Sequence, residues 1–297
     1  MHAAPISTFL LALSGMVSAK YGFSYSEDDF RDSGMRMYTK VINGKITGTN
    51  YYPFISQLFR TDDGGSNFSF ECTGSLIGSQ YVVTAAHCVH YSDRTIMPAK
   101  AFGLMIGSAE LATADDVQDF YNVTDIYVDG YRTESANDIA ILKLDREVLP
   151  TVATPVKIYP YQVTSSLPVE VAGFGITKLD STDLSQELMR ALVSVSNSTQ
   201  CEDFNSSWDN NSGPLICSIN ENGNDSCKGD SGGPLVAKLN GERTLVGITS
   251  WGVNMDFTNP SQCGNNTISY YVRAANFAKW AASTMGVDYT TVIQLKD

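Results

Sequence analysis

The chain has 297 residues, 43% of them hydrophobic, and its 32 acidic against 20 basic side chains give a formal net charge of −12. This length allows one large domain or two small ones with a substantial buried core. The negative charge argues against nucleic acid as a partner and favours a cationic peptide, although the solubility of an exported protein would explain the same balance.

The first forty residues are typical of segments that are removed from a mature protein. A short apolar run from Ile6 to Val17 leads into Ser18 and Ala19, a small-residue pattern suited to signal peptidase. The run is too short to span a bilayer, and no later stretch has the apolar length of a membrane helix. We therefore expect a secreted, extracellular protein that does not engage a membrane. Residues 20–40 are polar and mixed in charge, as in a propeptide.

Short β-branched and aromatic runs separated by turn residues fill the first half of the remaining chain. They cover residues 51–59, 74–77, 81–84 and 139–144. This density of short strands predicts an all-β barrel.

Two candidate catalytic side chains flank these runs. His87, in TAAHC, follows one predicted strand, and Asp138, in NDIAILKL, opens another. A general base needs one free ring nitrogen and an acceptor that holds the other, and Asp138 would be that acceptor. The alternative for Asp138 is a strand-end residue that caps backbone amides.

The second half contains the stretch GDSGGP, which includes Gly229, Asp230 and Ser231. A serine hydroxyl becomes a useful nucleophile only with a base and with amide donors for the oxyanion. The glycines would let the amides of Gly229 and Ser231 converge on one point. A glycine-rich turn beside a disulfide is the alternative. Residues 274–285 are predicted to form a terminal amphipathic helix.

The candidate residues occur in the order histidine, aspartate, serine. With CTGSLIGSQYVVTAAHC, NDIAILKL, VAGFGIT, DSCKGDSGGP and GITSWG, the chain from about Val41 to Trp280 resembles the trypsin-like serine proteases of the chymotrypsin family. The resemblance implies one peptidase domain over residues 41–297, built from two packed antiparallel six-stranded β-barrels that meet near 150–160 and carry a C-terminal α-helix. It implies a serine endopeptidase without a cofactor, with His87, Asp138 and Ser231 as the catalytic residues and Gly229 and Ser231 as the oxyanion hole.

The resemblance also implies activation by proteolysis. The sequence VING from Val41 resembles the new amino terminus that these proteases expose, so cleavage after Lys40 would free an ammonium group. In the family this ammonium pairs with the aspartate that precedes the serine, here Asp230, and the pair orders the site. The alternative is that Lys40 is an exposed residue of a linker. Autoactivation is a second hypothesis.

Substrate preference follows from the residue six positions before Ser231. Trypsin-like members carry an aspartate there, at the floor of the primary pocket, and this chain has Asp225. A carboxylate in that slot would hold Arg or Lys, so we expect cleavage after these residues. The alternative is a glycosylated surface loop, because residues 224–226 form a sequon. The resemblance places five more residues in the substrate site: Ser226, Ser250, Trp251, Gly252 and Ser269.

Several positions depart from the family pattern. Ser269 replaces a glycine that usually lines the pocket, which could narrow it and alter the balance between Arg and Lys. Residues 253–262 form a longer loop than usual, and Phe70 stands where many members place a histidine that helps to hold the inactive precursor.

Six cysteines in an exported chain allow three disulfides in any of 15 pairings. The resemblance implies the pairs Cys72 with Cys88, Cys201 with Cys217, and Cys227 with Cys263. With no CxxC motif and three histidines, we expect no metal site. Six sequons suggest glycosylation, with chance occurrence as the alternative, at Asn67, Asn122, Asn197, Asn205, Asn210 and Asn265.

Two classes of function remain. The first is a secreted endopeptidase, made as a zymogen, that cuts peptides or proteins after Arg or Lys through an acyl-enzyme. The second is a protease-like binding protein, a class that usually lacks a catalytic residue. Because all three candidates are present, the sequence favours the enzyme. We expect a monomer, with protein inhibitors as further candidate partners.

Overall fold

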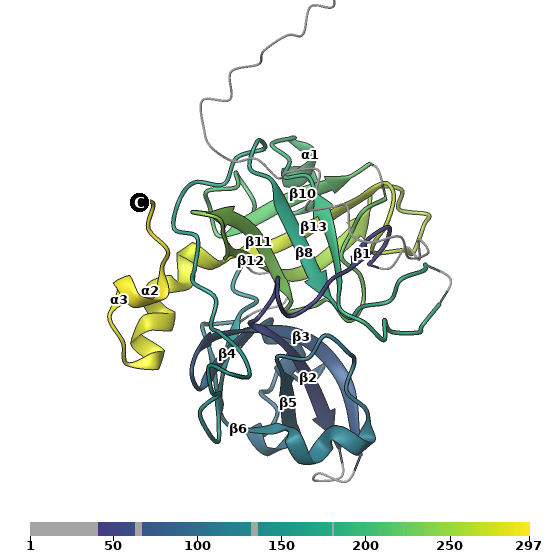
Figure 1. Cartoon of the computed structure of the whole chain (residues 1–297). Helices are drawn as coiled ribbons and strands as arrows, with labels where there is room; N and C mark the ends of the chain where they lie inside the picture. The colour runs from purple at the N-terminus through teal and green to yellow at the C-terminus, as the bar shows by residue number, and fades with distance from the viewer. Residues whose placement is uncertain (1–40, 63–66, 132–135, 180, 222) are drawn as a thin grey trace, which may run out of the picture. The chain divides into compact units, whose positions relative to one another are not determined.

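The computed structural model describes residues 41–62, 67–131, 136–179, 181–221 and 223–297, which are mainly β-structure (Figure 1). The predicted signal peptide, the predicted propeptide and Lys40 lie outside the described residues. A search of the described helices found none with the length and apolar character needed to cross a membrane.

Six strands of the first half close into an antiparallel barrel in the order β2-β3-β4-β7-β6-β5 (Figure 1). Closure pairs every strand on both sides and leaves no exposed edge. The predicted strands at 81–84 and 139–144 appear as β4 and β7. The bounds are β2 (Ile55–Thr61), β3 (Phe68–Gly78), β4 (Tyr81–Thr84), β5 (Phe102–Ile106), β6 (Tyr121–Val128) and β7 (Ala140–Leu144).

The second half forms a seven-stranded sheet in the order β1-β9-β8-β11-β12-β13-β10. The resemblance had implied six strands in a closed barrel. The seventh is β1, near the start of the described chain, which pairs with β9. An isolated antiparallel bridge between Val195, after β9, and Ser218, in β10, brings the ends of the other six strands together. The bounds are β1 (Lys45–Ile46), β8 (Val169–Gly173), β9 (Met189–Val193), β10 (Leu215–Asn220), β11 (Pro234–Leu239), β12 (Glu242–Asn254) and β13 (Thr267–Arg273).

Helices are short apart from the one near the C-terminus. The predicted helix over 274–285 is confirmed as α2 (Ala274–Met285), and the next residue, Gly286, has the left-handed conformation common just after helix C-termini. The others are η2 (Ala86–Val89), η3 (Ala99–Ala101), η4 (Ala114–Asp119), α1 (Gln200–Phe204) and α3 (Tyr289–Val292).

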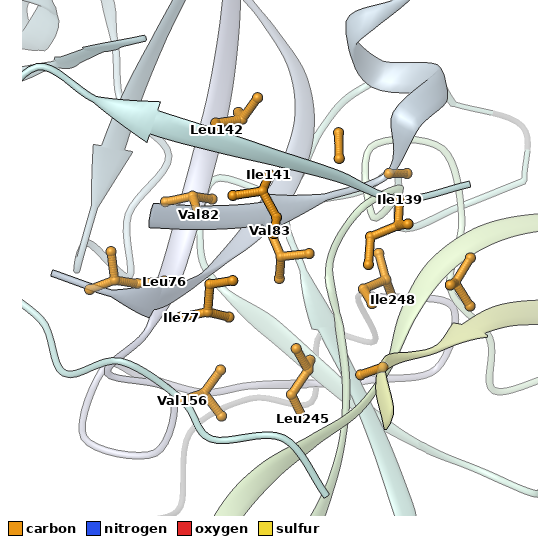
Figure 2. Close-up of a cluster of buried hydrophobic side chains, with 14 of the residues drawn as sticks. Leu76, Ile77, Val82, Val83, Ile139, Ile141, Leu142, Val156, Leu245 and Ile248 are labelled. Atoms are coloured by element: carbon orange, nitrogen blue, oxygen red, sulfur yellow. The ribbon is translucent and has the colours of Figure 1, made fainter. Parts of the chain in front are cut away.

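Apolar side chains from both halves meet in one buried cluster (Figure 2). Val83 of β4 and Ile141 of β7 lie opposite Leu245 and Ile248 of β12, and Phe277 of α2 lines the same small apolar gap. Complete burial stabilises each such side chain by about 1.5–3 kcal/mol. This contact fixes the strands that carry the candidate catalytic residues of the first half against those of the second.

Candidate active site

His87 and Asp138 are brought together by two neighbouring strands. His87 lies in η2, just after β4, and Asp138 lies just before β7, whose Ala140 is paired with Thr84 of β4. The Asp138 carboxylate accepts hydrogen bonds from the His87 backbone amide through Oδ1 and from its ring Nδ1 through Oδ2, both at 2.8 Å. Ser250 Oγ donates to the same Oδ2 at 2.5 Å. The ring is therefore held with Nε2 available for chemistry.

Electrostatics favour the ionised Asp138 and a basic His87. Burial lowers the pKa of His87, but the attraction and hydrogen bond of the Asp138 carboxylate, with a further contribution from Glu71, raise the pKa above its ordinary value. Burial raises the pKa of Asp138, but His87 and the Ser250 hydrogen bond bring it below the ordinary value. An imidazole of raised pKa is a better acceptor for a serine proton.

Ser231 faces the same pocket as His87, on the turn between Cys227 and β11. The backbone amide of Thr73, in β3, donates to the Ser231 carbonyl at 2.9 Å and fixes this turn against the first barrel. Among the described contacts, the His87 ring is bonded to Asp138, and no hydrogen bond joins it to the Ser231 hydroxyl. In enzymes without substrate such a bond is often long and tightens when substrate binds.

Two backbone amides are free beside Ser231. The Lys228 carbonyl accepts from the Ile176 amide at 2.8 Å. Because the carbonyl and N–H of one trans peptide point in opposite directions, the Gly229 amide points away from Ile176. Within the described residues, neither the Gly229 nor the Ser231 amide donates a hydrogen bond. Gly229 has φ +96°, a conformation that a side chain would strain. Both donors are therefore unoccupied among the described contacts, as the predicted oxyanion hole requires.

Asp225 lies beneath the pocket rather than on its wall. It is fully buried, and its carboxylate accepts from Ser269 Oγ at 2.7 Å, from Thr267 Oγ1 at 2.8 Å and from the Gly264 amide at 3.0 Å. Of the described residues, Ser269 lines the pocket and Asp225 does not. Burial raises the pKa of Asp225 to about 6, against the lowering effect of these hydrogen bonds.

The pocket walls contain residues that the sequence had not singled out. Tyr131, after β6, faces the pocket while its ring packs on His90 at 4.7 Å between centroids. Trp251, which the resemblance had placed in the substrate site, lines the pocket and stacks on Tyr270 at 4.5 Å between centroids. A lone tyrosine in a loop has no pattern that marks it, so only the fold reveals Tyr131. The lining residues are His87, Tyr131, Asp138, Ser226, Cys227, Lys228, Ser231, Thr249, Ser250, Trp251, Gly252, Gln262, Cys263 and Ser269.

The start of the described chain lies close to the base of the site. Val41 is fully buried, and Ile42 forms an antiparallel bridge with Asp225. The Asp230 carboxylate accepts from the amides of Gly175 at 2.9 Å and Cys227 at 2.8 Å. Burial nevertheless raises the pKa of Asp230 to about 7.

Phe70 stands at the position where the resemblance had led us to look for a histidine. Its ring packs edge-on against Phe59 and Phe174 at 5.6 and 6.3 Å between centroids. This position therefore contributes an apolar contact, and its side chain has no group that could pair with Asp230.

Three disulfides join Cys72 to Cys88, Cys201 to Cys217 and Cys227 to Cys263, the pairs that the resemblance implies. The first anchors η2, which carries His87, to β3, and the third joins two walls of the pocket. Cys72, His87 and Cys88 lie within the range of metal ligands, but both sulfurs are in a disulfide and cannot act as thiolates.

The candidate glycosylation sites differ in accessibility. Asn205 is 8% exposed, and its Oδ1 accepts from the Ser207 amide, so it is a poor acceptor for a sugar in the folded chain. The other five are exposed: Asn67, Asn122, Asn197, Asn210 and Asn265.

Comparisons with known proteins agree with this geometry. A family model described as Trypsin matches residues 41–281. The urokinase-type plasminogen activator of Gallus gallus is 28% identical over 272 residues, which cover 85% of this chain and 59% of the relative, so the chain spans less than two thirds of that protein. The CLIP domain-containing serine protease B4 of Anopheles gambiae is 27% identical, with 83% and 71% covered.

Two further comparisons concern shorter proteins. The human chymotrypsin-like elastase family member 1 is 29% identical over 238 residues, which cover 77% of this chain and 86% of the relative. The solved structure of neuropsin, a serine protease expressed in the limbic system of mouse brain, superposes with a TM-score of 0.63 at 23% identity, over 82% of this chain and 99% of that one. At this identity the structural match supports the fold alone.

Proposed function

Since the chain belongs to the trypsin family of serine endopeptidases, we propose that it cleaves peptide bonds after Lys or Arg with Ser231, His87 and Asp138 as its catalytic residues. The observation that carries the assignment is the double hydrogen bond from His87 to Asp138 in the pocket that also contains Ser231. This arrangement leaves one imidazole nitrogen free toward the substrate.

The reaction proceeds in two halves. Ser231 Oγ attacks the scissile carbonyl and its proton passes to His87 Nε2, while the amides of Gly229 and Ser231 hold the oxyanion. The intermediate collapses as the C–N bond breaks, and the leaving amine takes the proton from His87. Water then attacks the acyl-enzyme, gives a proton to His87, and releases the carboxylic acid as Ser231 regains its hydrogen. Asp138 stays ionised and stabilises the imidazolium at each stage.

In this proposal, specificity for a basic residue depends on the Asp225 carboxylate. The substrate side chain would contact Ser269, which is hydrogen-bonded to Asp225. The Ser269 hydroxyl lines the pocket and donates to Asp225, so it can accept a hydrogen bond from a substrate while it passes the negative potential of the carboxylate into the pocket. A Lys ammonium is a compact charge whose donors can rotate toward a single acceptor, whereas an Arg guanidinium is best matched by two carboxylate oxygens. We therefore place Lys ahead of Arg in the proposed preference.

We also propose that the protein is exported and made as a precursor that is cut after Lys40. The buried Val41 and the bridge from Ile42 to Asp225 support this, because a new amino terminus at Val41 would begin beside the base of the site. A Val41 ammonium would give the buried Asp230 a cationic partner. Three disulfides are consistent with an oxidising compartment.

The test is hydrolysis of short peptide amides that end in Lys, Arg, Phe or Ala, by the chain cut between Lys40 and Val41. We expect turnover of the Lys and Arg amides, with Lys preferred. Ser231→Ala and a serine-directed phosphonylating reagent should each abolish it. Absence of turnover with every amide would contradict the proposal and favour a protease-like binding protein, while equal turnover of Phe or Ala amides would contradict the specificity alone.

A further inference from the structure

The loop of residues 253–262 begins and ends at the wall of the pocket and is stabilised by its own hydrogen bonds. Trp251 and Gly252 of β12 line the pocket, β12 ends at Asn254, and Gln262 and Cys263 line the pocket again. The intervening residues are held by turns in which a side-chain oxygen accepts from a backbone amide two residues later. These pairs are Asn254 with Asp256 at 2.9 Å, Asp256 with Thr258 at 3.0 Å and Asn259 with Ser261 at 3.0 Å. The loop therefore has a defined form without an apolar core.

This loop presents an aromatic ring to solvent. Phe257 has 84% of its surface exposed, the largest value among the exposed large hydrophobic residues described. Its ring stacks on Phe204, with centroids 5.2 Å apart and planes 20° apart. Phe204 ends α1, which the Cys201–Cys217 disulfide ties to β10, so the pair rests on a fixed support. An apolar surface left open beside a cleft is typical of a binding site.

An extended peptide bound along the edge of β12 would run from the candidate catalytic residues toward Phe204 and Phe257. Residues 251–254 of β12 are paired with β13, whereas the described pairing with β11 stops at Ile248. An unpaired strand edge can accept an extended peptide through backbone hydrogen bonds. All pairings in this sheet are antiparallel. An antiparallel peptide therefore has its earlier residues beside the later residues of β12.

The strand spacing sets which substrate residue reaches the loop. A peptide whose scissile residue lies beside Ser250, which is bonded to Asp138, advances by about 3.3 Å per residue along the edge. Its fourth and fifth residues, counted back from the scissile bond, then lie beside Val253 and Asn254, where the loop begins.

We propose that Phe204 and Phe257 form a specificity site for an aromatic or branched aliphatic side chain at the fourth or fifth position before the scissile bond. The proposal rests on the proposed function of the cleft. Asp256, the acidic residue of this loop, makes a cationic occupant the competing possibility. Asp256 Oδ1, however, already accepts from the amide and the hydroxyl of Thr258, while the ring of Phe257 is open. The open ring favours an apolar occupant, which would remove more apolar surface from water.

The test compares peptide amides that share a Lys at the scissile position and carry Phe, Leu, Ala, Asp or Lys at the fourth or fifth position before it. With the chain cut after Lys40, we expect Phe or Leu at one of these positions to raise kcat/KM about fivefold over Ala. Phe257→Ala should remove this preference and leave the Ala peptide unchanged, whereas Phe257→Leu should keep part of it. Leu149→Ala, at a side chain that is 61% exposed in the first half, is the matched control and should leave the preference intact.

Binding of the same peptides to Ser231→Ala, followed by fluorescence anisotropy, separates this proposal from the catalytic one. A tighter Kd for the Phe peptide that depends on Phe257 supports the site, even if the wild-type chain cuts none of the peptides. Equal Kd and kcat/KM for Phe, Leu and Ala would overturn it. A preference for Lys at these positions, or an apolar preference that survives Phe257→Ala, would overturn it as well.

Discussion

At the scale of single residues, Asp138 is the acid in direct contact with His87. It holds His87 at two points and accepts from Ser250 as well. A neutral amide in its place could accept at one oxygen but would present a donor at the other position. The His87 ring would then lose the acceptor that selects its tautomer.

We therefore expect Asp138→Asn to lower kcat/KM by roughly 10⁴-fold while the chain stays folded. Circular dichroism and the urea midpoint report the fold, and hydrolysis of a Lys amide reports the activity. A loss smaller than tenfold would contradict the role proposed for Asp138. In the unsubstituted enzyme, the pKa read from the acid side of the kcat/KM profile should be higher than that of an ordinary histidine, because the pKa of His87 is raised.

Ser269 is the residue that separates Asp225 from the pocket. We expect Ser269→Gly to increase the ratio of Arg to Lys cleavage by about tenfold, because loss of the hydroxymethyl group opens space for a guanidinium and frees Asp225 Oδ1. Ser269→Ala, which removes the hydrogen bond and keeps most of the volume, is the control. Values of kcat/KM for paired Arg and Lys amides decide the matter, and an unchanged ratio in Ser269→Gly would contradict the proposed recognition.

At the scale of elements, the turn before β11 depends on glycine in a close approach to the first barrel. Gly232 has φ +76°, and a Cβ added there would lie 2.0 Å from Thr84 Oγ1 and 2.4 Å from the Thr73 carbonyl oxygen. The carbonyl belongs to β3 and cannot move alone. This packing, with the Thr73 amide bonded to the Ser231 carbonyl, positions Ser231, the proposed nucleophile, relative to His87.

We expect Gly232→Ala to reduce the free energy of unfolding by about 3 kcal/mol or more, and to abolish activity, since strain and steric overlap act together. The matched control is Gly241→Ala, where φ is +84° but no atom lies within 4 Å of an added Cβ. That variant should lose only about 1 kcal/mol. Urea unfolding of both variants makes the comparison, and similar losses would contradict the overlap at Gly232.

At the scale of the whole molecule, the buried carboxyl groups of Asp225 and Asp230 make the stability of the fold depend on pH. Burial raises the pKa of Asp225 to about 6 and that of Asp230 to about 7. A carboxyl group whose pKa is higher in the folded state binds its proton more tightly there than in the unfolded chain. The stability it contributes is therefore complete below about pH 4 and is lost as the pH rises through 6 and 7.

We expect the uncut Ser231→Ala chain to become less stable from about pH 4 to pH 7, by at most about 1.4 kcal/mol per pH unit for each group. Asp230→Asn in the same background should reduce this slope. Cleavage after Lys40 should reduce it too, because a Val41 ammonium would lower the pKa of Asp230. Thermal unfolding across the pH range tests this, and a slope that neither change alters would contradict the proposed pairing.

The amino-acid sequence alone determined the local chemistry: the strand-rich first half, the helix over 274–285, and the candidate nucleophile, base and acid in their order. These features depend on residue type and on spacing over a few positions, so they can be recognised without coordinates. The tertiary structure decided which distant groups meet. Ser269 contacts Asp225 across 44 positions, Ile42 is paired with Asp225, and Phe204 stacks on Phe257. Such contacts depend on strand register and on how loops return to the sheet, which no short stretch of sequence specifies.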